Sequence, residues 1–283
     1  MTAVLKAQLY RFRKQKSSFV ILIIGLIFAS VMAFSVGALL GNTPLAVKIQ
    51  EMVAASVQNS GNIYNQAMNA EILDMIANYE LSSIAAYISI GLSGDLLFIL
   101  FLFIIYFTNA TIRNGYLKTI LPNIRRSWLF FSDAIILLGY TVVLVLIYLI
   151  VFSLFSPLFF VNVPFGNTVS FVIFVILKIL LLFVSGLCII MTTDLFIKRP
   201  RMIIVSALYI TMISGIFYNL LNVIAKALFG SGAEAGYILP MGALTLLNYG
   251  NTVSYISGLI VSVVYLVLCV LVEVLVIPKK DLI

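Results

Sequence analysis

Three charged residues stand inside long apolar runs of this sequence, where a charge serves either helix packing or transport. At about 1.5 Å of rise per residue, Asp95 and Lys178 both lie roughly 15 Å from the outer ends of their runs, near the middle of a bilayer. An isolated charge there costs at least about 2.5–3.5 kcal/mol on insertion scales, so we predict that the two side chains form a pair or share a polar cavity. Such a pair would either fix the packing of the helices or line a transport path, and the sequence leaves both interpretations open.

Glu273 is the third of these charges and lies about one turn from the inner end of its apolar run. Its carboxylate would reach Lys279 or Lys280, or accept a hydrogen bond from a neighbouring helix, and a structural role is the simpler interpretation. The two cysteines, Cys188 and Cys269, also fall inside apolar runs. We interpret them as small buried hydrophobic residues and not as a disulfide framework.

A basic stretch from Asn109 to Asp133 separates two of the apolar runs. Apolar side chains recur within it at steps of three and four, which is the spacing of one face of a helix. The spacing predicts a short amphipathic helix, broken near Pro122, that docks on a partner. The alternative is a basic loop that only fixes the orientation of the chain. The bases of the stretch are Arg113, Lys118, Arg125 and Arg126, and its apolar face is Ile112, Tyr116, Leu117 and Ile120.

Several enzyme classes are excluded by the residues that the sequence lacks. The chain has no histidine, which excludes an imidazole general base and any site where histidine binds zinc or haem. It has no Gly-x-x-x-x-Gly-Lys loop for nucleotide phosphates, and only one aspartate, Asp95, is deep enough for intramembrane proteolysis by a pair of aspartates. We therefore expect no catalytic residues, no metal site and no cofactor on this chain, and no enzymatic activity of its own.

The composition identifies a membrane protein. With 63% hydrophobic and 10% charged residues, the chain falls far outside the range of soluble domains. We expect an all-α polytopic fold in which residues 1–283 form a single transmembrane domain of six helices. The predicted spans are Phe19–Leu40, Ile84–Thr108, Phe131–Phe155, Val169–Thr192, Met202–Ala225 and Val253–Ile277.

The segments between the spans carry patterns of their own. Residues 1–17 are basic and predict a cytoplasmic interfacial helix on anionic lipid, with a signal peptide as the alternative. Residues 41–83 predict an extracellular helical hairpin, because two stretches with helical spacing flank a middle rich in Asn, Ser and Gly. Residues 228–251 include a piece at Pro240 that is too short to cross and too apolar for a solvated loop, which predicts an outer re-entrant helix.

The positive charge is distributed unevenly along the chain. Most of the 17 lysines and arginines fall in residues 1–17, 109–133, 194–201 and the last few residues. By the positive-inside rule, these segments and both termini are cytoplasmic in a multi-pass protein of the plasma membrane. The net charge of +7 therefore indicates orientation and contact with membrane lipid, and not binding of nucleic acid.

This layout resembles the permease subunit of type-2 ABC exporters. The similar features are a basic amphipathic N-terminal helix before the first of six spans, and Gly115-x-Leu117-Lys118 followed by Arg125 or Arg126 in the cytoplasmic stretch. A piece with a proline, Pro240, before the last span and a short basic tail complete the resemblance.

The resemblance implies a set of partners. Permeases of this family work as dimers, each half coupled to a cytoplasmic ATPase subunit, so the expected partners are an ABC ATPase and a second permease copy in a homo- or heterodimer. ATP and Mg would be bound by the ATPase and not by this chain. Residues 109–130 would form the segment that couples to the ATPase, through Arg113, Gly115, Tyr116, Leu117, Lys118, Arg125 and Arg126.

The function implied by the resemblance is export of a hydrophobic or amphipathic substrate such as a peptide, a lipid or a drug. The predicted spans contain few charges, which suits such a substrate better than a sugar or an ion. One alternative is a channel or secondary transporter built on Asp95 and Lys178. Another is a membrane scaffold or sensor subunit that binds a ligand with its outer hairpin.

Overall fold

The computed structural model describes residues 2–14, 16–59, 81–92, 96–113, 126–195, 223–224, 226–227 and 239–275. Across these residues the chain is helical and has no strand, which confirms the all-α prediction. The helices are α1 (Thr2–Lys14), α2 (Lys16–Leu40), α3 (Pro44–Asn59), α5 (Ile84–Gly91), α6 (Leu96–Arg113), α8 (Arg126–Phe159), α9 (Thr168–Leu195), α12 (Pro240–Leu246) and α13 (Thr252–Leu275).

Within the described residues, five helical stretches are long and apolar enough to cross a membrane. They match five of the six predicted spans, and one of them comprises α5 and α6, with residues 93–95 between the two helices outside the described part. The remaining predicted span, residues 202–225, lies outside the described residues except for Val223 and Ile224. The stretches are Lys16–Leu40, Ile84–Phe107, Phe130–Phe159, Thr168–Met191 and Thr252–Leu275.

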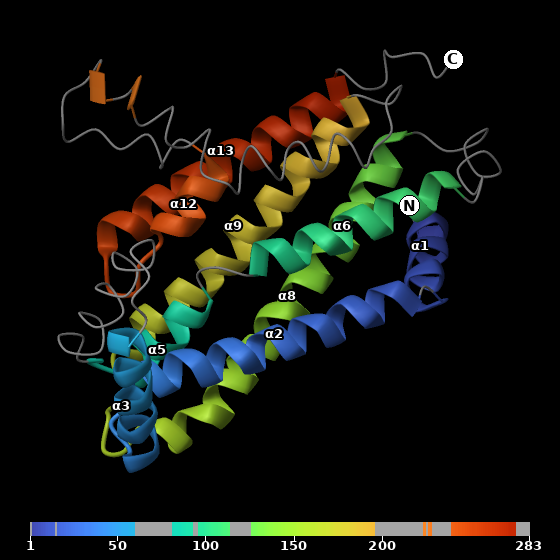
Figure 1. Ribbon diagram of the computed structural model, residues 1–283. Helices are drawn as coiled ribbons and strands as arrows, with labels where there is room; N and C mark the ends of the chain where they lie inside the picture. Colours follow the sequence, from blue (N-terminus) through green and yellow to red (C-terminus); the bar gives the residue numbers. More distant parts are fainter. Residues whose placement is uncertain are drawn as a thin grey trace.

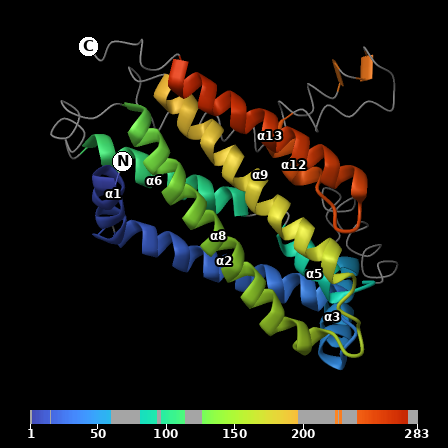
Figure 2. The same ribbon diagram turned by 180° about the vertical axis from the view of Figure 1, so that it is seen from behind.

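The helices form an elongated bundle in which α2 and α13 lie on opposite sides, with α6, α8 and α9 between them (Figures 1 and 2). The closest pairings are α2 with α8 and α9 with α13. Large apolar side chains remain exposed along α2 and α13, from Phe19 to Phe34 on the first and from Val253 to Leu275 on the second. Such surfaces suit hydrocarbon, because lipid chains solvate them as well as other apolar side chains do.

One end of the bundle is tied together by hydrogen bonds between distant segments. The backbone N–H of Ile84 donates to Pro164 O at 3.0 Å, which binds the start of α5 to the turn between α8 and α9. The Asn42 amide pairs with both backbone groups of Val161, at 2.9 and 2.8 Å, and so binds the end of α2 to the same turn. The segments that the charge pattern assigns to the outer side therefore meet at one end, opposite α1 (Figure 1).

A row of small residues brings α2 close to its neighbours. Gly25, Ala29, Ala33 and Gly37 follow one another at steps of four and are all buried, so they share one face of the helix. The Phe159 ring leaves no room for a side chain at Gly37. Gly37 and Gly41, which are also four residues apart, both lie against Phe159 at the end of α8, so the small residues allow a close contact between the helices.

The first half of the predicted outer hairpin is a helix, and residues 60–80 of it lie outside the described part. This first half is α3, which turns away from α2 at the end of the bundle that holds the turn between α8 and α9 (Figure 1). Gln50 Nε2 donates to Leu39 O and Gly41 O, both at 3.0 Å. These carbonyls lie at the end of α2 and are left without an intrahelical donor, so Gln50 caps the helix.

Candidate functional site

Lys178 stands in the middle of α9 and is fully buried, with 0% of its surface exposed. Its Nζ donates a hydrogen bond to Leu244 O at 2.7 Å and lies 5.6 Å from the centre of the Phe174 ring. The side chain of Lys178, which the sequence placed deep in this span, is therefore buried among other residues. Backbone carbonyls and aromatic faces are the usual neighbours of an ammonium group that apolar surroundings have desolvated.

The acceptor of this bond belongs to α12, a seven-residue helix that begins with Pro240 at its first position. Proline suits that position because its missing N–H would have no intrahelical partner there. The helix packs on α9 and α13, and its residues from Pro240 to Leu244 are buried. A short helix is therefore present at Pro240 before the last described span, and its predicted re-entrant position in the membrane stays a prediction.

The first residue of α6, Leu96, lies at about the same level as Lys178. A Cβ added at Gly186 would lie 3.3 Å from Ile104 Cδ1, so α6 and α9 meet at these residues. Both helices run away from the end that holds the turn between α8 and α9, so they are parallel. Leu96 lies about eight residues before Ile104, and Lys178 about eight before Gly186. At about 1.5 Å per residue, Leu96 and Lys178 are therefore at the same level.

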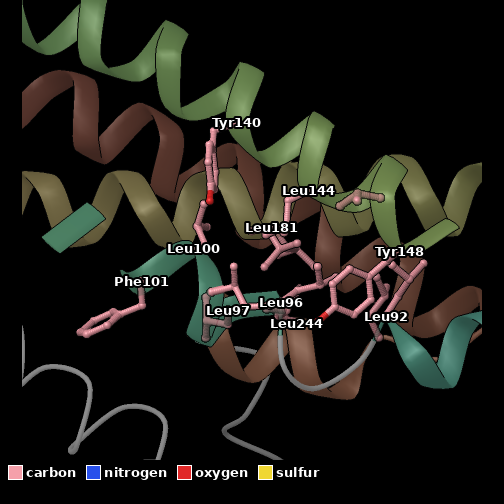
Figure 3. Packing of buried hydrophobic residues seen from close by; sticks show 14 of the residues in the cluster. Leu92, Leu96, Leu97, Leu100, Phe101, Tyr140, Leu144, Tyr148, Leu181 and Leu244 are labelled. Carbon is pink, nitrogen blue, oxygen red and sulfur yellow. The ribbon is translucent and has the colours of Figure 1, made fainter. Parts of the chain in front are cut away.

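Buried leucines from these elements meet at that level. Leu92 and Leu96 belong to the same cluster of buried residues as Leu181 of α9 and Leu244 of α12 (Figure 3). All four are buried. The predicted partner of Lys178, Asp95, lies outside the described residues, so the pairing of these two side chains stays a prediction.

The helix α1 packs against the opposite end of the bundle from the outer turn. The Phe12 ring lies 6.0 Å from the Phe103 ring and 6.5 Å from the Tyr140 ring, in both cases edge to face. Phe103 and Tyr140 stack on each other with their centres 3.7 Å apart, which joins α6 to α8. Aromatic contacts of this kind contribute about 0.5–1.5 kcal/mol each beyond the burial of area.

The charged side chains of α1 point away from this contact. Lys6, Arg13 and Lys14 are exposed, whereas Gln8 is buried. Phe12 holds the helix to the bundle, but the two faces are only partly separated, because the apolar Leu9 and Tyr10 are 47% and 65% exposed.

The basic coupling segment is described only at its two borders. Arg113 is the last residue of α6 and Arg126 the first of α8. The remaining predicted coupling residues lie outside the described part, so neither the short helix nor its break at Pro122 is tested. These residues are Gly115, Tyr116, Leu117, Lys118 and Arg125.

Two further predictions concern the C-terminal parts of α9 and α13. Glu273 is buried, with 2% of its surface exposed, while the lysines that the sequence offered as partners, Lys279 and Lys280, lie outside the described residues. Cys188 and Cys269 carry free thiols, as predicted.

Comparisons of the chain with protein-family models, with curated proteins and with solved structures found no match.

Proposed function

We propose that this chain is the permease subunit of an ABC exporter, which forms the membrane pathway for a hydrophobic or amphipathic substrate such as a peptide, a lipid or a drug. A separate ATPase subunit supplies the energy, and ATP and Mg are bound there. The proposal rests on one arrangement: α1 packs at the same end of the bundle as the two borders of the basic segment, Arg113 and Arg126. A partner that grips this end would contact both elements at once.

The aromatic contacts of α1 provide a route by which such a partner would move the bundle. Phe12 touches Phe103 of α6 and Tyr140 of α8, and these two rings are stacked. A displacement of α1 is therefore passed to two spans through packed side chains, which do not compress. The exposed bases of α1 would face acidic ATPase surface or lipid phosphate.

The pathway itself would lie where α5, α6, α9 and α12 meet. We propose that α12 is a re-entrant helix, since the carbonyl of Leu244 meets a lysine about 15 Å along α9 from its outer end. In this proposal Asp95 pairs with Lys178, because the register of α6 and α9 brings the residues next to Leu96 level with the ammonium group. The pair would offset the cost of two charges near the midplane.

The orientation and the assembly complete the proposal. The basic end is cytoplasmic, residues 202–225 form the sixth span, and a second permease copy completes the pathway in the plasma membrane. Orientation is tested with single cysteines in a chain whose native cysteines are replaced by serine. A membrane-impermeant maleimide should label Lys48→Cys from outside intact cells and Lys118→Cys only after permeabilisation, and the reverse result would overturn the orientation.

Co-purification tests the function. The tagged chain is extracted in mild detergent from the membrane in which it is native, and the bound proteins are identified and quantified by mass spectrometry. A stoichiometric ATPase supports the proposal. Purification without any ATPase, with transport that follows an ion gradient, would overturn it.

The second candidate is a secondary transporter, and one observation favours it. The seven-residue helix α12 brings a backbone carbonyl to the buried Lys178, and short or broken helices beside an intramembrane charge are typical of such transporters. Transport by the purified chain alone in vesicles, driven by an ion gradient, would select this candidate.

A further inference from the structure

The two cysteines of the chain lie against each other across the contact between α9 and α13. Cys188 Sγ and Cys269 Sγ are 3.6 Å apart, although 81 residues separate them in the sequence. Cys269 is fully buried and Cys188 is half-buried. The two helices are among the most closely packed in the bundle, so the thiols are held as neighbours by the fold.

The position of the pair along the helices makes it accessible to polar reagents. Cys188 lies about 30 Å along α9 from Thr168, and Cys269 about 26 Å along α13 from Thr252, at about 1.5 Å per residue. The hydrocarbon core of a bilayer is about 30 Å thick. The thiols therefore lie near the boundary of the hydrocarbon at the basic end, where small water-soluble oxidants reach them.

We propose that Cys188 and Cys269 form a modification site at which a peroxide joins α9 to α13 through a disulfide. The sulfurs must approach from 3.6 Å to about 2.05 Å, a shift of about 1.5 Å. Rotation of two cysteine side chains supplies a shift of this size without separating the helices. The pair needs no third residue, so the site is complete within this chain.

The chemistry balances with hydrogen peroxide as the oxidant. The half-buried thiol of Cys188 attacks one peroxide oxygen and gives up its proton, which breaks the O–O bond and gives a sulfenic acid and water. The thiol of Cys269 then attacks the sulfenic sulfur, forming the S–S bond and releasing a second water. Two thiols lose two protons and two electrons, and one peroxide molecule becomes two molecules of water.

The disulfide would hold the inner halves of α9 and α13 together. In the reduced protein these halves are joined only by non-covalent contacts at this point, and packed helices slide by small movements. The covalent bond removes this freedom. The disulfide forms in the same way whatever the protein transports, because its formation depends only on the contact between the two helices.

The experiment counts thiols in the full-length chain reconstituted in lipid vesicles. The protein is treated with hydrogen peroxide, denatured, and reacted with a maleimide polymer that adds a visible mass for each free thiol. Because the sequence contains only two cysteines, any bond within one chain joins Cys188 to Cys269. We expect both thiols to disappear together from the monomer, with loss of two hydrogens in the intact mass, and to return after reduction with dithiothreitol.

The single variants Cys188→Ser and Cys269→Ser separate this reaction from independent oxidation. In Cys188→Ser the thiol of Cys269 should stay reactive under peroxide conditions that convert the unsubstituted chain, whereas in Cys269→Ser the Cys188 thiol should gain oxygen in the intact mass and not lose two hydrogens. The proposal is wrong if the unsubstituted chain also gains oxygen in place of losing two hydrogens. It is also wrong if the unsubstituted chain keeps both thiols, or is linked only into dimers, under conditions that oxidise glutathione completely.

Discussion

Lys178 Nζ donates a 2.7 Å hydrogen bond to Leu244 O, so a fully buried side chain of α9 holds the seven-residue helix α12 in place. The bond spans 66 residues of sequence and brings a backbone carbonyl to the middle of a membrane-crossing helix. A carbonyl in hydrocarbon needs a donor, and an ammonium group needs acceptors. Each group therefore offsets part of the cost of burying the other.

Replacing Lys178 should loosen α12. In Lys178→Met the carbonyl of Leu244 loses its donor, which costs about 1–3 kcal/mol when the group stays buried. We expect faster amide hydrogen exchange in residues 240–247, measured by mass spectrometry on the protein in lipid. The matched control is Lys48→Met on the exposed surface of α3, which should leave that exchange unchanged. Equal exchange in the two variants would show that the bond does not hold α12.

A larger side chain at Gly37 should separate α2 from α8. The Phe159 ring already fills the space beside Gly37, so Gly37→Leu forces the helices apart and destabilises the protein by about 1–3 kcal/mol. The control is Gly139→Leu, because nothing lies within 4 Å of a Cβ added at Gly139. Thermal unfolding in detergent should show a lower midpoint for Gly37→Leu only. Adding Phe159→Ala should restore part of the loss, and purely additive effects would contradict a direct clash.

Removing the Phe12 ring should release α1 from the bundle. Phe12→Ala loses two edge-to-face contacts and the burial of the ring, worth about 1–3 kcal/mol in total. Limited proteolysis in vesicles should then cut within residues 2–14 more quickly. Tyr10→Ala is the control, since Tyr10 is 65% exposed and lies on the same helix. If both variants are cut at the same rate, Phe12 is not the residue that holds α1.

Charges in the apolar face of the basic segment should uncouple the proposed partner. Tyr116→Asp with Leu117→Asp places two carboxylates where apolar residues would anchor an ATPase, and such anchors dominate interfaces. We expect loss of ATPase association and of transport, with normal insertion into the membrane. Asn123→Asp, a change in the same segment outside that face, should keep the ATPase bound. Retention of the ATPase by the double variant would show that the contact lies elsewhere.

The membrane-crossing helices could be predicted closely because run length and charge suffice for them. The predicted span Val169–Thr192, for example, lies within the helix Thr168–Leu195. Lys178 could be predicted to be buried for the same reason, because any membrane-crossing helix placed in this apolar run would contain it. The apolar piece at Pro240 predicted a short helix but not its bounds, although the proline at the first position of α12 is a usual start signal.

The contacts between helices could not be predicted in the same way. The acceptor for Lys178 is a backbone carbonyl, and every residue carries one, so no side-chain pattern singles out Leu244. The row of small residues on α2 did leave a signal, since Gly25, Ala29 and Ala33 repeat at steps of four. Steps of this kind are common in apolar sequences, and only the approach of Phe159 shows which face is used.

The hydrogen bonds at the outer turn also decide where the bundle can open. Asn42 is bonded to both backbone groups of Val161, and Asn167 N–H to the Tyr249 hydroxyl at 2.8 Å, so segments far apart in the sequence share one rigid cap. Around Phe12, the described contacts of α1 with the spans are between rings, which slide more readily than paired amides. In any large movement, the spans would therefore rotate about the hydrogen-bonded cap, and their basic ends would separate.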